Sequence, residues 1–198
     1  MRMLREKAEC CLKQPVLLLP TLPRTRYLPI LRLWHSPSFS ANKSWCIYKA
    51  TGAGSARYNS AVVETCWDAP SDSKRMMMDP LEGLKSGFKP DPTLTTRFAP
   101  FDLDRYSALL EMRNVMSLAL SAEHNSVYLD GEVWGFENFE SSQGSRLQWR
   151  GDGPSDWQPL VKAFHNLLSV AQSALEAKDY QSYQAELRVE PLKEFIPS

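Results

Sequence analysis

Residues 76–198 of this chain contain no cysteine. The four cysteines, Cys10, Cys11, Cys46 and Cys66, all precede that part. A domain formed by residues 76–198 therefore depends on neither disulfides nor Cys-ligated metal. No CxxC pair or Cys/His spacing typical of a zinc site occurs in the chain. This cysteine usage fits a reducing compartment, and we expect an intracellular protein, with mitochondrial and cytoplasmic locations as the two alternatives.

Acidic residues are missing from one long stretch. None occurs between Glu9 and Glu64, and residues 1–75 carry 12 Lys/Arg against 5 Asp/Glu, a balance of +7. Residues 76–198 carry 11 against 18, a balance of −7, so the formal net charge of zero conceals two parts of opposite sign. A basic, acid-poor first part is typical of a transit peptide or a basic disordered tail.

Long apolar runs are also absent. The best candidate, residues 16–19, is followed at once by Pro20. A membrane-spanning helix needs roughly 20 apolar residues. We therefore expect no membrane span, and no secretory signal either, because no long apolar core precedes a small-residue cleavage site.

The sequences that carry common catalytic chemistry are missing. No G-x-S-x-G occurs, and the turn at 151–155 lacks the lysine of a phosphate-binding loop. His124 and His165 are the only histidines after residue 92, and both fall at the margins of predicted helices. We predict no catalytic residue, no metal site and no cofactor, and we favour a non-enzymatic protein with the enzyme question left open.

The basic first part contains a few structural signals. Residues 2–13 can form an amphipathic helix, which Pro15 ends. The prolines between Pro15 and Pro37 favour extended chain, yet the apolar residues among them are too many for an inert linker. Residues 45–66 can form a small hairpin around a Gly-containing turn. We predict that residues 1–75 are a largely disordered basic leader or targeting segment.

A linker follows at residues 76–92, where Pro, Ser, Asp, Gly and Lys predominate. Met76, Met77 and Met78 stand where the charge balance changes sign. This coincidence suggests an alternative start at Met76 and predicts that a fragment beginning there folds by itself.

The remaining residues, 93–198, carry the clearest folding signal. A capping pattern at Ser155 and apolar residues at helical spacing predict a long amphipathic helix to about residue 178. Asp130-Gly131 is a two-residue hairpin signal that would split 127–139 into two strands. The other predicted elements are strands at 93–98, 146–150 and 185–189 and a helix at 102–122.

This order, β-α-β-β-α-β, predicts an α+β domain in which two helices pack on one face of a mainly antiparallel sheet of four or five strands. A ferredoxin-like arrangement is the first choice. If the hairpin at 130–131 forms, a fifth strand enters and the arrangement becomes an α+β meander.

Aromatic residues are concentrated around the predicted strands at 127–150. We expect a non-enzymatic protein-interaction module, an adaptor, assembly or inhibitory protein, that binds another protein through a sheet face or edge. The alternatives are a small enzyme or ligand or metal binder using the acidic residues Asp130, Glu132, Glu137 and Glu140, and RNA binding through the sheet, which the acidic domain disfavours. The predicted binding residues are Tyr128, Trp134, Phe136, Arg146, Gln148 and Arg150.

Overall fold

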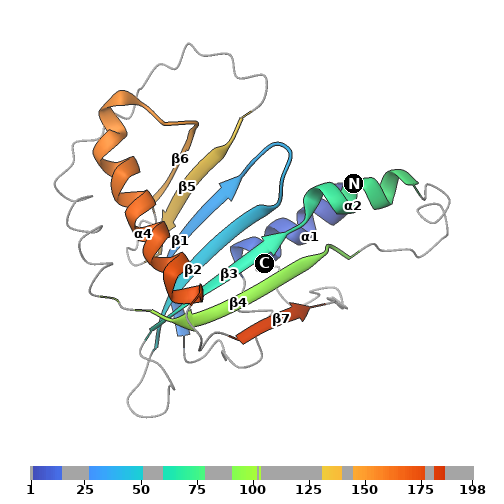
Figure 1. Ribbon diagram of the computed structural model, residues 1–198, viewed down its shortest axis with the longest axis horizontal. Coiled ribbons are helices and arrows are strands. Elements are labelled where there is room, and N and C mark those ends of the chain that lie inside the picture. The colour runs from blue at the N-terminus through green and yellow to red at the C-terminus, as the bar shows by residue number, and fades with distance from the viewer. Residues whose placement is uncertain are drawn as a thin grey trace, which may run out of the picture.

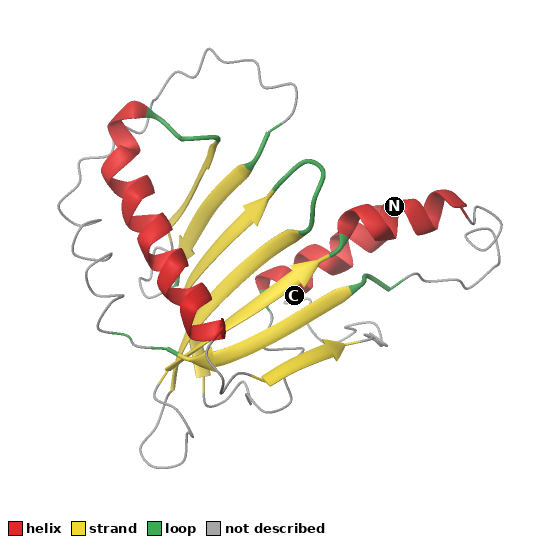
Figure 2. Ribbon diagram, in the orientation of Figure 1, coloured by secondary structure: helices red, strands yellow, loops and turns green. Residues whose placement is uncertain are grey.

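The computed structural model contains one antiparallel sheet with helices on both of its faces (Figures 1 and 2). The structure describes residues 2–14, 27–50, 60–78, 91–101, 103, 131–139, 145–176 and 181–185. No helix within these ranges is long and apolar enough to cross a membrane.

The seven strands that the structure describes have the spatial order β6-β5-β1-β2-β3-β4-β7, and every neighbouring pair is antiparallel. The first three strands of the chain therefore occupy the middle of the sheet, with β5 and β6 on one side and β4 and β7 on the other. The strands are β1 (Tyr27–Ser36), β2 (Asn42–Ala50), β3 (Ser60–Trp67), β4 (Leu94–Pro100), β5 (Val133–Asn138), β6 (Ser145–Arg150) and β7 (Gln181–Ala185).

Strand β1 shows how a proline fits into a central strand. The register between β1 and β2 shifts between Pro29 and Leu31, which marks a bulge or irregularity. Proline supplies no backbone N–H, and bulges are among the few positions where a sheet tolerates it. From Leu31 to His35 the strand pairs regularly with β2 on one side and β5 on the other.

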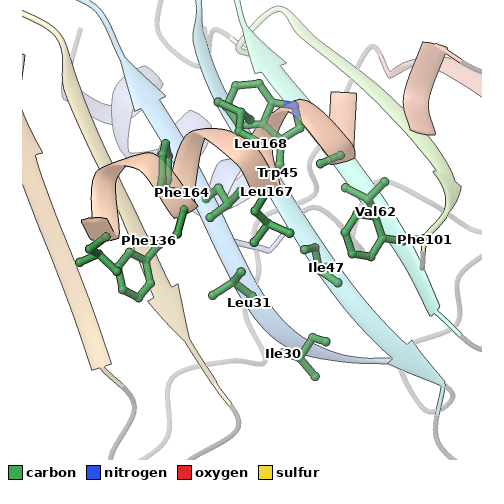
Figure 3. Close-up of a cluster of buried hydrophobic side chains, with 14 of the residues drawn as sticks. Ile30, Leu31, Trp45, Ile47, Val62, Phe101, Phe136, Phe164, Leu167 and Leu168 are labelled. Atoms are coloured by element: carbon green, nitrogen blue, oxygen red, sulfur yellow. The ribbon is translucent and has the colours of Figure 1, made fainter. Parts of the chain in front are cut away.

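Helix α4 (Gln158–Glu176) covers one face of the sheet, which we call the α4-side face. A short 3-10 turn (Ser155–Trp157) precedes it, and Gln158 donates a hydrogen bond to the Asp152 carbonyl oxygen at 2.8 Å. The N-cap residue of this turn is Pro154, and no side-chain hydrogen bond caps the turn, so the cap predicted at Ser155 does not form. The buried core beneath α4 (Figure 3) includes Leu31, Trp45, Ile47, Val62, Phe136, Phe164, Leu167 and Leu168.

The opposite face, which we call the α1-side face, carries helix α1 (Arg2–Lys13), seen behind β2 and β3 in Figure 1. Ala8 and Cys11 of α1 are buried against Trp67 and Leu94. A second cluster on this face contains Tyr27, Cys46, Tyr48, Val63 and Phe98. Both faces of the central strands are therefore covered.

Helix α2 (Ala69–Met78) is fastened to the sheet by Asp72, whose side chain is buried. The carboxylate of Asp72 accepts hydrogen bonds from Trp67 Nε1 at 2.8 Å and from the Thr93 backbone N–H at 2.9 Å. Arg75 adds an ion pair at 3.0 Å. One buried carboxylate thus joins the end of β3 to the start of β4 through α2.

The α+β class and the antiparallel sheet are confirmed, but the ferredoxin-like order and the count of four or five strands are not. The predicted strands at 93–98 and 146–150 correspond to β4 and β6, and the long helix corresponds to the 3-10 turn and α4. The strand predicted at 185–189 lies outside the described residues apart from Ala185, which is the last residue of β7 (Gln181–Ala185). The predicted helix at 102–122 and the hairpin turn at 130–131 lie outside the described residues, apart from Leu103 and Gly131.

The prediction of a largely disordered segment at 1–75 is wrong for the residues described. Residues 2–13 form α1, and residues 27–67 supply β1, β2 and β3. The strands predicted around 45–66 pair antiparallel as β2 and β3. Residues 69–78, placed partly in the leader and partly in the linker, form α2. The predicted start of the folded domain was placed too late in the chain, because the basic residues of 1–75 suggest disorder. Such residues are also compatible with strands whose charged side chains are paired or exposed.

Candidate functional site

The α1-side face contains a pocket of about 410 Å³ near the end of α1. Its walls come from both charge-segregated parts of the chain, with Arg32 and Tyr48 from the basic part and Glu137 and Arg146 from the acidic part. These residues meet because β5 pairs directly with β1. We call this the Arg32 pocket.

Arg32 lies at the floor of this pocket, and its side chain is only 4% exposed. Its guanidinium forms an ion pair with Glu137, Nη2 to Oε2, at 2.7 Å. The Nε atom of Arg32 is buried without a hydrogen-bond partner. Burial lowers the pKa of Arg32, while the neighbouring Glu137 opposes that shift. Glu137 therefore offsets part of the cost of burying this cation.

Trp34 supports two arginines beside the pocket. The guanidinium carbons of Arg32 and Arg146 lie 4.9 and 5.0 Å from the centroid of its ring. Gly135 leaves room for this indole, since a Cβ at that position would overlap Trp34 and lie 2.6 Å from the Leu147 carbonyl oxygen. The small glycine on β5 thus lets an aromatic platform lie against the sheet.

The described residues that line the Arg32 pocket carry a net positive charge. Lys13, Arg32 and Arg146 contribute three positive charges to its lining, and Glu137 contributes one negative charge. Lys13 and Arg146 are exposed, and the residues described include no ion-pair partner for either. The lining also includes the aromatic side chains Tyr27, Tyr48 and Phe139.

A second hollow of about 730 Å³ lies on the same face, between α1, the start of α2 and the turn after β1. Arg150, Arg5 and Glu9 are among its lining residues. Arg146 and Arg150 are both on β6, four residues apart, so they project from the same face of the strand. Each exposed arginine of β6 thus adjoins a different hollow.

The structure separates the six predicted binding residues. Arg146, Gln148 and Arg150 are exposed on the α1-side face. Phe136 is buried in the core beneath α4, and Trp134 lies on that same α4-side face. Tyr128 lies outside the described residues.

The acidic residues considered as a site do not converge. Glu137 pairs with Arg32 on the α1-side face, whereas Glu132 lies 3.4 Å from His35 Nε2. Asp130 and Glu140 are outside the described residues. Within the described ranges, no group of three or more His, Cys, Asp and Glu side chains is placed to hold a metal ion.

The remaining buried ionisable groups have structural partners. Glu64 accepts hydrogen bonds from Trp45 Nε1 at 2.8 Å and from Arg97 Nε at 2.8 Å. Burial raises the pKa of the Cys46 thiol to about 12, so this thiol is protonated and unreactive near neutral pH. These groups stabilise the sheet and leave the Arg32 pocket as the candidate site.

Sequence reasoning missed Arg32, Tyr48 and Lys13 because they lie in the part interpreted as a leader. The available signal was the excess of apolar residues between Tyr27 and Trp34, which indicated that another part of the protein covers them. The rest of the sheet and its helices provide this cover, since Leu31, Leu33 and Trp34 are all buried.

His35 lies on the α4-side face, stacked on Trp134 with ring centroids 3.7 Å apart and planes 7° apart. Burial lowers the pKa of His35 from its usual 6.5. Glu132 opposes this shift, while Lys43 and His165 reinforce it. Protonation therefore favours the unfolded chain, so this stabilising contribution is complete above the unfolded pKa and is lost as the pH falls below it.

We accordingly expect the free energy of unfolding to decrease more between pH 7.5 and pH 5.5 in the native sequence than in His35→Gln. Urea unfolding of both proteins at the two pH values measures the difference. An equal decrease in the two proteins would contradict the assigned direction of the His35 shift.

Comparison with known proteins identified no relative of this chain. No protein-family model matches the chain, and no match to it was found among curated proteins or solved structures. The functional argument therefore rests on the residues themselves.

Proposed function

We propose that this chain is a non-enzymatic interaction module that binds an extended, acidic segment of another protein along β6 on the α1-side face. The observation that carries this proposal is the row of exposed side chains on β6, Arg146, Gln148 and Arg150. Trp149, between them, is buried on the other face. One face of β6 is thus anchored in the core and the other presents two cations.

The position of β6 supports this mode of binding. Among the strands that the structure describes, β6 is the last on its side of the sheet, and it pairs with β5. An edge strand offers backbone N–H and C=O groups to an incoming extended segment, which adds to the sheet as one more strand. Carboxylates at alternate positions of that segment would face Arg146 and Arg150, so charge complementarity favours an acidic partner.

The first step of the test replaces Gln148 with a photo-reactive benzophenone amino acid that can crosslink a bound partner. The same amino acid in place of Asn166, which is exposed on α4, serves as the control. We expect a discrete adduct from position 148 and none from position 166. The captured protein is then identified by mass spectrometry, purified and titrated against Arg150→Glu. Charge reversal should weaken binding by about tenfold or more, since a buried interfacial charge pair is worth several kcal/mol and an exposed one less.

The matched control for that titration is Lys162→Glu, the same charge reversal at an exposed position of α4. Its affinity should stay within about twofold of the native protein, because exposed charges far from an interface contribute little. Equal affinities for Arg150→Glu and the native protein would exclude β6 as the docking site.

A further inference from the structure

We propose that the Arg32 pocket is a binding site for a small organic anion, a carboxylate or a phosphate carried on an aromatic body. This site shares Arg146 with the β6 edge proposed above, but it does not depend on the interaction proposed there. The pocket volume of about 410 Å³ falls within the range of roughly 300–1,000 Å³ found for ligand pockets.

The charged lining selects an anion. The described lining contains three basic side chains and one carboxylate. The side chain of Arg32, one of the three, is 4% exposed and therefore 96% buried. Charges in a partly buried site are screened less than charges on the surface, so the excess positive potential persists inside the pocket. Arg146 presents a planar guanidinium at the rim, and that geometry matches a carboxylate through two parallel hydrogen bonds.

Glu137 is the only acid among the described lining residues, and it reduces the positive charge of the pocket without cancelling it. Glu137 is held at the floor by Arg32, at 2.7 Å, and its side chain is 28% exposed. It offsets one of the three positive charges, so the described lining keeps a net positive charge that attracts carboxylates and phosphates alike.

The walls select the rest of the ligand. Tyr27 and Tyr48 are buried, and Phe139 is half-buried at the end of β5. Leu28, 55% exposed, adds an apolar rim. Aromatic rings pack favourably against one another in edge or offset arrangements, so a flat aromatic body is the preferred apolar group.

The experiment uses naphthalene-2-carboxylate as the probe and titrates it into the full chain by isothermal calorimetry. The neutral isostere naphthalene-2-carboxamide and the dianion 2-naphthyl phosphate are titrated in parallel. We expect the carboxylate to bind about tenfold or more tightly than the carboxamide, since charge-assisted hydrogen bonds are roughly twice as strong as neutral ones. We expect the phosphate to bind at least as tightly as the carboxylate, because the described lining carries a net positive charge.

Two variants locate the site. Arg146→Gln should weaken binding of the carboxylate by about tenfold, because it removes the guanidinium at the rim. Arg150→Gln, the same change on the same face of β6 but outside the pocket, should leave the affinity within about twofold. Both arginines are exposed, so circular dichroism should show the same fold in both variants.

Several results would overturn the proposal. The first is the absence of calorimetric and NMR signals at about 5 mM probe, a millimolar limit that corresponds to a binding free energy of only about 4 kcal/mol. The second is equal binding of the carboxylate and the carboxamide. The third is an equal loss of affinity in Arg146→Gln and Arg150→Gln. Weaker binding of the phosphate than of the neutral carboxamide would also overturn the assignment to an anion site. None of these results bears on the interaction at β6, which is measured with another ligand and at Arg150.

Discussion

A fragment beginning at Met76 and ending at Ser198 is expected to be unfolded in water. It would lack β1, β2 and β3, which lie between β5 and β4 in the sheet. The pairs β5–β6 and β4–β7 would then be two isolated two-stranded units, and such units are marginally stable at best. The structure therefore contradicts the self-folding expected of a fragment with this start.

The loss of the core makes the effect large. The fragment would lack five fully or nearly fully buried side chains beneath α4: Leu31, Leu33, Trp45, Ile47 and Val62. Burying one such side chain stabilises a fold by about 1.5–3 kcal/mol, and a whole domain is stable by only about 5–15 kcal/mol. The surfaces left on α4 and β5 cannot be covered by the residues that remain in the sheet.

Far-UV circular dichroism and amide proton NMR spectra of the fragment and of the full chain provide the measurement. We expect narrow amide dispersion and no cooperative urea transition for the fragment, and both native signatures for the full chain. A cooperative transition in the fragment alone would show that residues 76–198 form an independent domain and that the central position of β1–β3 is wrong.

Phe164→Ala is expected to lower the free energy of unfolding by about 4 kcal/mol. The Phe164 side chain is fully buried at the centre of α4 and makes edge contacts with Trp149 at 4.9 Å and Trp134 at 5.8 Å between ring centroids. Phe→Ala substitutions in cores typically cost about 3–5 kcal/mol, because they remove buried apolar surface and leave a cavity. Figure 3 shows this side chain between α4 and the sheet.

The control is Asn166→Ala, two residues further along α4 and exposed. Surface substitutions of this kind usually change stability by no more than about 0.5 kcal/mol. Urea unfolding of the two variants and the native chain gives both values. A loss below about 1 kcal/mol in Phe164→Ala would mean that α4 does not pack on the sheet as described.

Strand β6 and helix α4 were predictable because their patterns are simple. Arg146, Gln148 and Arg150 alternate with Leu147 and Trp149, and the structure places the two sets on opposite faces of β6. The apolar spacing of α4 likewise matches its buried face. When one face of a helix or strand is exposed and the other is buried, the spacing of polar and apolar residues in the sequence shows which residues belong to which face.

The central strands could not be recognised in the same way, because they are covered on both faces. Strand β1 is buried without interruption from Ile30 to Trp34, and one of those buried residues is Arg32. Such a strand shows no alternation, and its proline and arginine look like features of a leader. Only the pairing with β2 and β5 shows why these residues fit.

The candidate site was predicted in part. The exposed row on β6 followed from its alternation, whereas the Arg32 pocket depends on a partner 105 positions away, Glu137. Sequence spacing carries no information about which strands become neighbours across such a distance. Trp134 and Phe136 were predicted to bind a partner because they are aromatic, and the structure places both on the α4-side face, packed against the core.

The central claim is that the basic and acidic parts of the chain form one sheet and meet at Arg32 and Glu137. A double-mutant cycle with Arg32→Met, Glu137→Met and the double variant tests this contact directly through urea unfolding. Removing one partner leaves a buried charge or an unsatisfied carboxylate, and removing both relieves that cost. We expect a coupling energy of about 1–3 kcal/mol, since contacting residues in one network couple to this extent. Additivity to within about 0.3 kcal/mol would contradict the contact, and with it the shared sheet and its pocket.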